Sequence, residues 1–339
     1  MKKSTIYDVA KMAGVSPGTI SRHLNGYELR DYNKIKVEQA IEELGFKENI
    51  IAKGLKSHRS MTVAVLIPEL TGLFSLDILK AIDLVLEEKG YTLIISDYER
   101  DPERLKQRLK IFEQRSIDGL IIFPLSHGDS CLEEMQRYLR NETPIICLSD
   151  KIKDLPCDYI HGGNRMASYN AIEELINKGH RNIRIVTGRR GTMVTNERME
   201  GCREAFRKYG IPESEYSILW TDYTMNNARD IVLEELKRNP PTAVYCTSYY
   251  LTMGCVLALN KSDLQLGEDV SLIGHDYYPG IEIITPALTT VEHDLEKMGS
   301  TAGKLLLKRI ENGNPTEPED IEIPMSLNIR KSVKDLKSI

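Results

Sequence analysis

From residue 61 onward, short apolar runs alternate with amphipathic segments roughly every 30 residues, and this alternation restricts the possible folds most strongly. Near-continuous apolar strands joined by helical crossovers are typical of parallel sheets covered on both faces. The number of strand–helix units is too large for one open sheet, and we therefore expect two doubly wound sheets. We place the boundary between them near 158–163, a polar segment that contains glycine. The expected strands are 62–67, 91–96, 119–123, 144–148, 183–187, 217–220, 243–247 and 270–274, and the expected helices are 76–89, 102–115, 166–178, 198–209 and 227–239.

Length and composition place the chain among folded multidomain proteins. Its 339 residues, with 41% hydrophobic and 28% charged side chains, leave room for two large cores and a small additional element. The longest apolar runs, such as 63–67 and 120–123, are far shorter than the ~18 residues of a membrane span. Asp8 lies where a secretory leader would be apolar, so we expect a cytoplasmic protein without a membrane partner.

The cysteines and histidines show no spacing typical of a metal site. Six cysteines are scattered without a CxxC pair, so we expect no metal, disulfide or cofactor. We expect each imidazole to be exposed or to have its hydrogen bonds satisfied; those considered are His127, His161, His180, His275 and His293.

Charge is distributed unevenly along the chain. The whole chain carries a net charge of −5, whereas residues 1–59 hold eleven Lys and Arg against seven Asp and Glu. A small basic head therefore precedes an acidic body. This asymmetry is typical of a DNA-binding module joined to another domain, although a charged terminus is more often only solvated.

The head contains the residues that typically mark the helix boundaries of a helix-turn-helix. A helix over 6–12 would end at Gly14, and Ser16 would cap a second helix that begins at Pro17 and runs to about Asn25. A third helix is expected over 33–44. Such an arrangement presents the second helix to the major groove, with Arg22 as the base reader; Tyr7, Thr19, Ser21, Asn25 and the lysines would contact phosphates. The alternative is a three-helix bundle without a role in DNA binding.

These residues resemble the N-terminal signature of the LacI family of bacterial transcription regulators, and the similarity continues through about residues 4–332. The matching segments are 5–10 (TIYDVA), 13–16 (AGVS), 19–22 (TISR), 40–46 (AIEELGF), 117–121 (IDGLI), 178–180 (KGH), 273–276 (IGHD) and 285–291 (TPALTTV). The resemblance implies an all-α helix-turn-helix head joined to an α/β body like that of periplasmic binding proteins, made of two doubly wound parallel-sheet subdomains. The implied divisions are a DNA-binding domain at 1–48, a hinge helix at 49–59 and an effector-binding body at 60–339, with an N-lobe at 60–160 and 292–320 and a C-lobe at 161–291 and 321–332.

The resemblance also assigns residues to the operator. Ser16, Thr19, Ser21, Arg22 and Asn25 stand at contact positions. Pro17 and Gly18 occupy two recognition positions without offering a hydrogen-bonding side chain, so base discrimination would rest on Arg22 and His23. In the hinge that begins at Asn49, Leu55 would insert into the minor groove beside Ala52; the alternative for Leu55 is packing against the body.

In the implied effector cleft, Phe74, Arg198, Tyr223 and Asp276 stand at ligand-contact positions. Arg198 and Asp276 would grip a polyol or a purine edge, or would instead form a structural ion pair. The sequence departs from the family at Gly163-Asn164 and at Ser248-Tyr249, and the second departure adds Tyr249 to the expected site. Losing acidic acceptors there argues against an ordinary neutral hexose.

The resulting hypothesis is a sequence-specific DNA-binding regulator that acts as a repressor and is controlled by a sugar, a sugar derivative or a similar metabolite. It would bind a pseudo-palindromic double-stranded operator as a homodimer, since nine residues after Arg330 are too few for a tetramerising tail. P-loop, GxSxG and HExxH motifs are missing, so we expect no enzyme. The alternatives are a small-molecule binding protein with a vestigial head and a double-Rossmann enzyme such as a sugar-nucleotide transferase.

Overall fold

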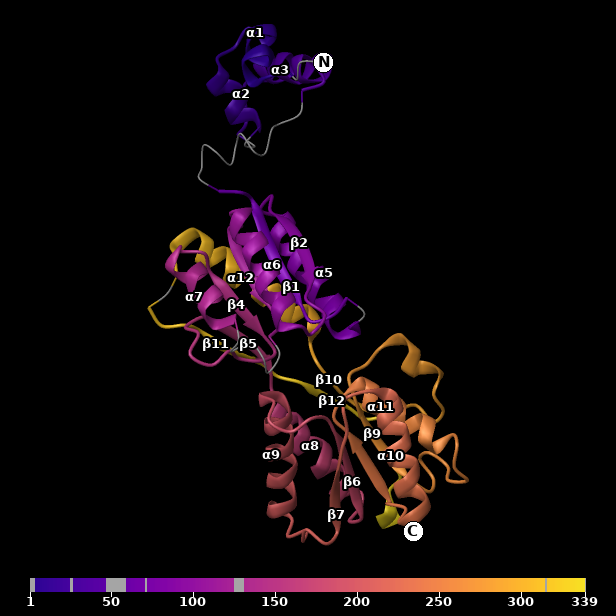
Figure 1. Cartoon of the computed structure of the whole chain (residues 1–339). Helices are drawn as coiled ribbons and strands as arrows, with labels where there is room; N and C mark the ends of the chain where they lie inside the picture. The colour runs from indigo at the N-terminus through magenta and orange to yellow at the C-terminus, as the bar shows by residue number, and fades with distance from the viewer. Residues whose placement is uncertain are drawn as a thin grey trace. The chain divides into compact units, whose positions relative to one another are not determined.

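The structure is a computed structural model that describes residues 4–24, 27–46, 59–70, 72–124, 131–314 and 316–338. The chain divides into two units, Met1–Met61 and Thr62–Ile339. We refer to the first as the head and to the second as the body, and Figure 1 labels their helices and strands. The expected hinge, with Asn49, Ala52 and Leu55, lies outside the described residues, as does Asn25.

The head consists of α1 (Ile6–Ala13), α2 (Pro17–Leu24) and α3 (Asp31–Glu43). Thr5 and Asp8 form a reciprocal capping box at the start of α1, and Gly14 ends that helix in the left-handed conformation, with φ of +66°. The two expected helix boundaries at Gly14 and Ser16 are confirmed, while α3 begins two residues earlier than expected. A small core holds the three helices together; its buried members are Val9, Ala10, Ala13, Ile20, Val37 and Ala40.

The body contains two six-stranded sheets. The first has the order β11-β5-β4-β3-β1-β2, and all of its recorded pairings are parallel. Its strands are β1 (Thr62–Ile67), β2 (Thr92–Asp97), β3 (Gly119–Ile122), β4 (Ile145–Leu148), β5 (Asp158–Gly162) and β11 (Asp320–Ile323). The helices α5 (Leu73–Glu87) and α12 (Leu295–Asn312) pack together, as do α6 (Pro102–Gln114) and α7 (Leu132–Arg140). We call this sheet with its four helices the N-lobe.

The second sheet, with the order β12-β10-β9-β8-β6-β7, forms the C-lobe together with four helices. Its strands are β6 (Ile183–Thr187), β7 (Tyr216–Trp220), β8 (Ala243–Cys246), β9 (Ser271–His275), β10 (Thr289–Glu292) and β12 (Ser326–Asn328). The helices α8 (Asn164–Asn177) and α9 (Met193–Lys208) enclose one core, and α10 (Met225–Arg238) and α11 (Tyr249–Leu259) enclose another. Only β12 runs antiparallel to its neighbour among the recorded pairs. Short 3-10 helices lie at Pro279–Ile283 and Leu336–Ser338.

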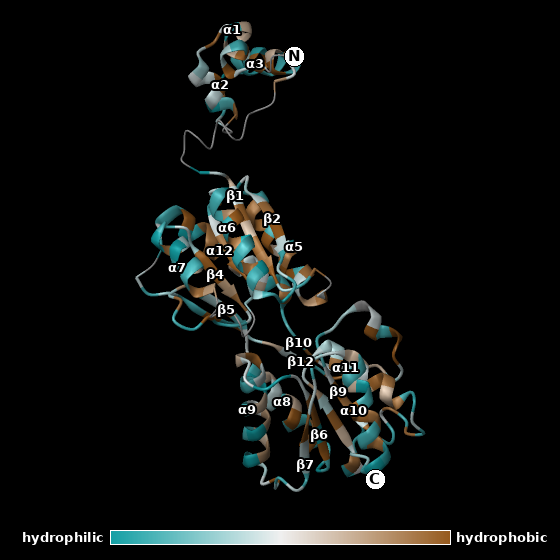
Figure 2. Ribbon diagram, viewed as in Figure 1, coloured by the Kyte–Doolittle hydropathy of each residue, from teal (hydrophilic) through white to brown (hydrophobic). Residues whose placement is uncertain are grey.

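Apolar strands lie between helices whose outer faces are polar, as Figure 2 shows by hydropathy. The expectation of two doubly wound sheets is confirmed by the strand order. No helix in the part of the chain that the structure describes is long and apolar enough to cross a membrane.

The first expected boundary between the lobes, near 158–163, coincides with the end of β5, which occupies 158–162, pairs with β4 and β11 and was not among the expected strands. Asp158 is buried there because the Arg309 guanidinium donates to both carboxylate oxygens, at 2.8 and 3.0 Å. The C-lobe was expected to resume at residue 321, but residues 320–323 form β11 of the first sheet and 326–328 form β12 of the second, so the final crossing between the lobes falls at 324–325.

Candidate functional site

The second helix of the head presents a polar surface to solvent. Ser16, Pro17, Gly18 and Arg22 are exposed, and Tyr7 on α1 is 71% exposed. Thr19, Ser21 and His23 are half-buried, whereas Ile20 is completely buried against α1 and α3. The structure therefore turns one face of α2 into the core and leaves the expected DNA-reading face accessible.

Ser16 fixes the first turn of this helix. Its Oγ accepts a hydrogen bond from the Thr19 backbone N–H at 3.2 Å and lies 3.0 Å from the Thr19 hydroxyl. A Cβ at Gly18 would meet only the Ser16 hydroxyl, at 3.7 Å. Pro17 and Gly18 are exposed at this turn and offer no hydrogen-bonding side chain.

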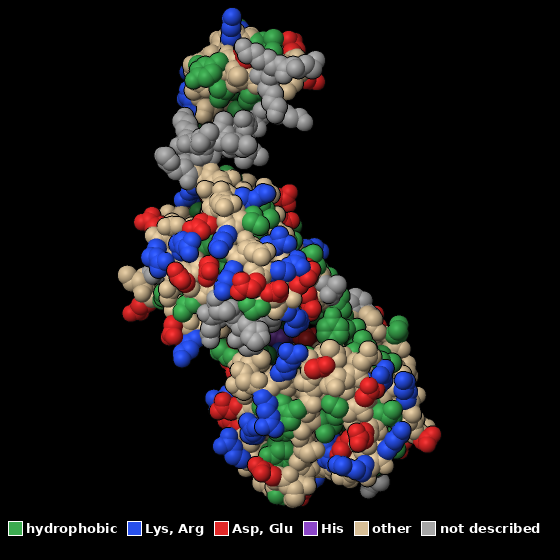
Figure 3. All heavy atoms as spheres, viewed as in Figure 1, with side chains coloured by type: hydrophobic (Ala, Val, Ile, Leu, Met, Phe, Trp, Pro, Cys, Tyr) green, Lys and Arg blue, Asp and Glu red, His purple; other side chains and the backbone are tan. Residues whose placement is uncertain are grey.

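The body holds a cavity of about 440 Å³ lined by both lobes. Figure 3 shows the crevice between the lobes, where acidic and histidine side chains are visible. Helix α5 of the N-lobe lines one side, and the segments that follow β9 and β10 of the C-lobe line the other. Asp276 and His293 belong to this lining, so an expected ligand residue faces an accessible cavity.

Arg198, on α9, is a rigidly held donor in this region. Its side chain is buried; Nε donates to Asn164 Oδ1 at 2.8 Å, and Nη1 donates to the Thr247 carbonyl oxygen. Nη2 lies 3.4 Å from His293 Nε2. Among the described residues, no carboxylate lies within ion-pair distance of Arg198, so the alternative of a structural Arg198–Asp276 ion pair is wrong.

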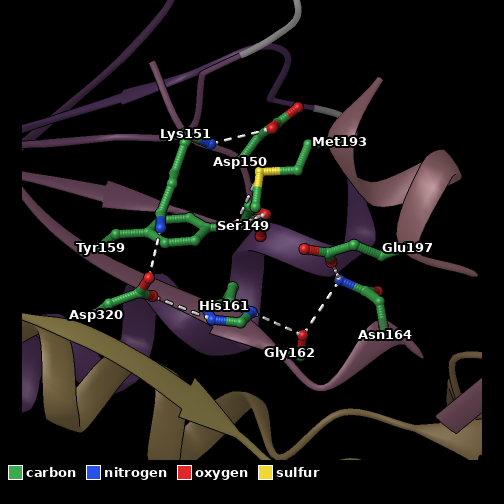
Figure 4. Close-up of polar contacts among 10 residues, drawn as sticks. All are labelled: Ser149, Asp150, Lys151, Tyr159, His161, Gly162, Asn164, Met193, Glu197 and Asp320. Carbon is green, nitrogen blue, oxygen red and sulfur yellow. Dashed lines mark hydrogen bonds and ion pairs between the residues drawn. The ribbon is translucent and has the colours of Figure 1, made fainter. Parts of the chain in front are cut away.

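Asn164 orients Arg198 and connects it to the N-lobe side of the site. Its Nδ2 donates to the Gly162 carbonyl at 3.2 Å and to Glu197 Oε2 at 3.0 Å (Figure 4). Sequence reasoning treated Asn164 only as part of a departure from the family pattern. Its role depends on the start of α8 lying beside α9, and spacing along the chain does not show this.

Asp276 follows β9 in a left-handed conformation, with φ of +63°. Burial raises the pKa of this carboxyl to about 6, and the charge of Arg198 and a hydrogen bond from the Tyr249 backbone N–H act in the opposite direction. Its Oδ1 lies 3.6 Å from His293 Nε2. Asp276 is therefore an acceptor whose charge changes in the range of mild acidity.

Two histidines that sequence reasoning left aside lie beside these residues. His275 and His293 have ring centroids 5.7 Å apart, and Phe74 meets His293 edge-on at 5.1 Å. Burial lowers the pKa of both imidazoles, that of His293 to about 3, and Arg198 acts in the same direction. Both rings are thus neutral at pH 7.

The expectation that each histidine is exposed or satisfied is wrong for this pair. Within the described part of the chain, His275 Nε2 and His293 Nδ1 are buried without a hydrogen-bond partner, as is the Ser149 hydroxyl. Buried polar atoms without partners are uncommon, and they mark places where a ligand or water completes the network. The two histidines belong to different strand ends, so their proximity is not visible in the sequence.

The expected aromatic residues fall into two groups. Tyr249 packs edge-on against Tyr278 at 4.7 Å and donates its backbone N–H to Asp276, so it borders the acceptor. The Tyr223 ring covers Gly188, where a Cβ would come within 1.9 Å of the ring. The Tyr223 hydroxyl lies 2.6 Å from Thr195 Oγ1. Thr195 precedes Arg198 by about one turn of α9, so the Tyr223 hydroxyl contacts the same helix as the one that carries Arg198.

The N-lobe contributes a polar wall that Figure 4 shows. The Tyr159 hydroxyl donates to the Ser149 carbonyl at 2.9 Å and lies 3.9 Å from the sulfur of Met193, a C-lobe residue. His161 Nε2 lies 3.2 Å from Asp320 Oδ1. The two lobes thus meet through side chains from β5 and α9.

Comparison with known proteins agrees with this architecture. Residues 5–49 match the family described as bacterial regulatory proteins of the lacI family, and residues 172–333 match a periplasmic binding protein-like domain. The HTH-type transcriptional regulator DegA of Bacillus subtilis (strain 168) is 28% identical over 99% of this chain and 100% of its own length.

Solved structures show the same arrangement. A lac repressor dimer bound to operator and an anti-inducer has a TM-score of 0.83 at 24% identity and covers 98% of this chain and 100% of its own. A complex of the transcriptional regulator CelR with cellobiose has a TM-score of 0.72 at 26% identity and covers 97% and 99%. With its helix-turn-helix head and two-lobed body, the chain belongs to the LacI family and is a transcriptional regulator.

Proposed function

We propose that this regulator is a homodimeric repressor that binds a pseudo-palindromic operator through its two heads and responds to a small polar effector bound between its lobes. The exposed face of α2, fixed by the Ser16 cap and centred on Arg22, is the observation that carries the DNA-binding part. Twofold symmetry of a dimer would match two half-sites. The protein would act in the cytoplasm and without catalytic turnover.

Base reading would depend on Arg22. Its guanidinium can donate two hydrogen bonds to a guanine edge, which neither Pro17 nor Gly18 can replace. Tyr7, Ser16, Thr19 and Ser21 would contact the phosphate backbone, with His23 at the edge of the surface. The hinge residues Asn49, Ala52 and Leu55 keep the minor-groove role expected from the family.

The effector site would combine fixed donors, acceptors and aromatic edges. Arg198 donates, Asp276 accepts, and Phe74, Tyr223 and Tyr249 supply ring surfaces. The unpartnered atoms of Ser149, His275 and His293 favour a ligand rich in hydroxyl groups, such as a sugar or a sugar derivative. The similarity to a regulator whose structure holds cellobiose supports this class. Ligand binding would change the angle between the lobes and so shift the population that binds DNA.

Operator binding can be tested by selecting duplexes from a random library with the full chain and titrating the enriched duplex by fluorescence anisotropy. We expect a pseudo-palindromic consensus and an affinity that falls steeply with salt. Arg22→Ala should weaken specific binding about 10- to 100-fold. Arg238→Ala, an exposed arginine on the body, is the matched control and should bind normally. No enrichment, or an Arg22→Ala protein that binds like the wild type, would contradict the proposal.

Effector binding can be tested by thermal denaturation with a panel of sugars, sugar phosphates and nucleobases. A ligand that raises the melting temperature of the wild type should have no effect on Arg198→Ala or Asp276→Asn. Arg203→Ala, an exposed arginine on the same helix, should respond as the wild type does. Equal responses in all four proteins would place the ligand elsewhere.

A further inference from the structure

Three potential metal ligands from two strand ends converge at the boundary of the cavity. His275, Asp276 and His293 each offer one ligand atom, and these atoms all lie within 4.8 Å of one another. His275 lies at the end of β9 and Asp276 directly follows it, while His293 directly follows β10, the parallel neighbour of β9. Small side-chain adjustments would bring the three atoms into one coordination sphere.

The immediate surroundings prepare His275 for this role. Its Nδ1 lies 3.2 Å from the Tyr245 hydroxyl, which in turn lies 3.0 Å from Ser168 Oγ. When Nδ1–H donates to Tyr245, the lone pair of Nε2 is free, and Nε2 is the atom without a partner. A hydrogen bond that fixes the tautomer of a metal-binding imidazole is a regular feature of metal sites.

The cavity wall carries negative charge that would attract a cation. Its lining includes five carboxylates against one lysine, Lys80: the acidic residues are Asp77, Asp276, Glu292, Asp294 and Glu296. One of them, Glu292, is paired with Arg330 at 2.9 Å. The others leave the route to Asp276 and His293 predominantly acidic.

Arg198 opposes this attraction. Its Nη2 lies 3.4 Å from His293 Nε2, so its charge would repel a bound cation. Its hydrogen bonds to Asn164 Oδ1 and to the Thr247 carbonyl oxygen are with uncharged acceptors, which leave that charge in place. We therefore expect a reversible site and not a permanently occupied structural one.

We propose that His275, Asp276 and His293 bind one divalent transition-metal ion, of the zinc, nickel or cobalt class. Two imidazoles and one carboxylate favour these ions over magnesium and calcium, which prefer oxygen ligands. The ion would lie at the inner end of the cavity, where it leaves coordination positions open to a hydroxyl-bearing ligand or to water. This inference goes beyond the effector-controlled repressor proposed above, because it concerns the ion itself.

The test begins with full-length protein stripped of metal by a chelator and titrated calorimetrically with Zn²⁺. One ion per chain should bind, and Co²⁺ should give a visible spectrum typical of mixed nitrogen and oxygen coordination. His293→Gln should weaken Zn²⁺ binding at least ~100-fold. His161→Gln is the matched control, because His161 also lies beside a carboxylate, that of Asp320, and it should bind Zn²⁺ like the wild type.

A second variant separates this site from adventitious binding. Arg198→Met removes the repelling charge and should tighten Zn²⁺ binding at least ~10-fold, while it abolishes the response to a sugar effector. Unchanged Zn²⁺ affinity in both His293→Gln and Arg198→Met, or no binding to the wild type, would overturn the proposal. Circular dichroism of each variant shows whether it is folded, and Asp276→Asn replaces any variant that is not. Operator binding is measured separately, so failure of the metal site leaves the proposed repressor standing.

Discussion

The head and the body place their polar groups in opposite ways. On the head, Arg22 and Ser16 stand on an exposed helix face above a core of six small and medium side chains. In the body, Arg198, Asp276, His275 and His293 are withdrawn from solvent and held by neighbours from several strands and helices. Exposed positive charges are suited to binding a large polyanion such as DNA, because its phosphates can pair with them. Enclosed, fixed groups suit a small ligand that must be distinguished by shape.

This difference also separates the energetic consequences of substitution. An exposed side chain contributes little to folding, so its replacement affects mainly binding. An enclosed charged group is coupled to the stability of the whole lobe, because its partners lose their hydrogen bonds when it is removed. The following substitutions test that distinction.

The largest effect is expected at the enclosed ion pair of the N-lobe. Arg309→Ala leaves the buried Asp158 carboxylate with the hydrogen bond from the Glu319 backbone N–H but without the two from the guanidinium, and it should lower the free energy of unfolding of the body by about 3–5 kcal/mol. Lys308→Ala removes only an exposed pair with Glu319 and should cost less than ~1 kcal/mol. Urea denaturation of both variants makes the comparison. Equal losses would show that burial does not determine the difference.

A smaller and pH-dependent effect is expected at Asp276. Because folding raises the pKa of this acid to about 6, its contribution to stability is present below pH ~4 and is lost as the pH rises through about 6. Asp276→Asn removes this loss. In metal-free protein the variant should match the wild type at pH 4 and exceed it by about 2–3 kcal/mol at pH 8.

The measurement is urea denaturation at several pH values. The neutral histidines add their own dependence at acidic pH, but it is common to both proteins and largely cancels in the difference. A stability difference that does not change between pH 4 and pH 8 would show that the carboxyl does not titrate as inferred.

The smallest effect is expected in the head. Thr5→Ala removes the hydroxyl that caps α1 and should destabilise that helix by about 1 kcal/mol. Hydrogen exchange of residues 6–13 in the full chain should become about 5-fold faster, whereas exchange in the body stays unchanged. Thr5→Ser keeps the capping oxygen and should exchange like the wild type. A change in the body as well would show that the loss of the cap is not confined to α1.

The predictability of each region follows from the range of the interactions that build it. The end of α1 depends on Gly14 and the start of α2 depends on Ser16. Both residues form hydrogen bonds with partners no more than four residues away, so these two boundaries could be located correctly from the sequence. The periodicity of the body likewise indicated two parallel sheets. The polar strand β5 was missed because Arg309, its counter-charge, lies 151 residues away along the chain.

The effector side of the body was predictable only through family resemblance. Arg198 and Asp276 could be named in this way, and the structure brings both beside His293. The roles of Asn164, His275 and His293 required the topology, because the ends of β9 and β10 meet only when the sheet is formed. Hydropathy and spacing carry no information on such a meeting.

The three connections between the lobes are very short. Gly163 alone separates β5 from α8, residues 293–294 separate β10 from α12, and residues 324–325 separate β11 from β12. Connections of this length limit sliding of the lobes against each other but permit rotation about the connections, as at a hinge. His293 lies in one of these connections. A ligand or ion bound to its imidazole would act close to the rotation axis, where a rotation of a few degrees produces a much larger displacement at the distant edge of each lobe.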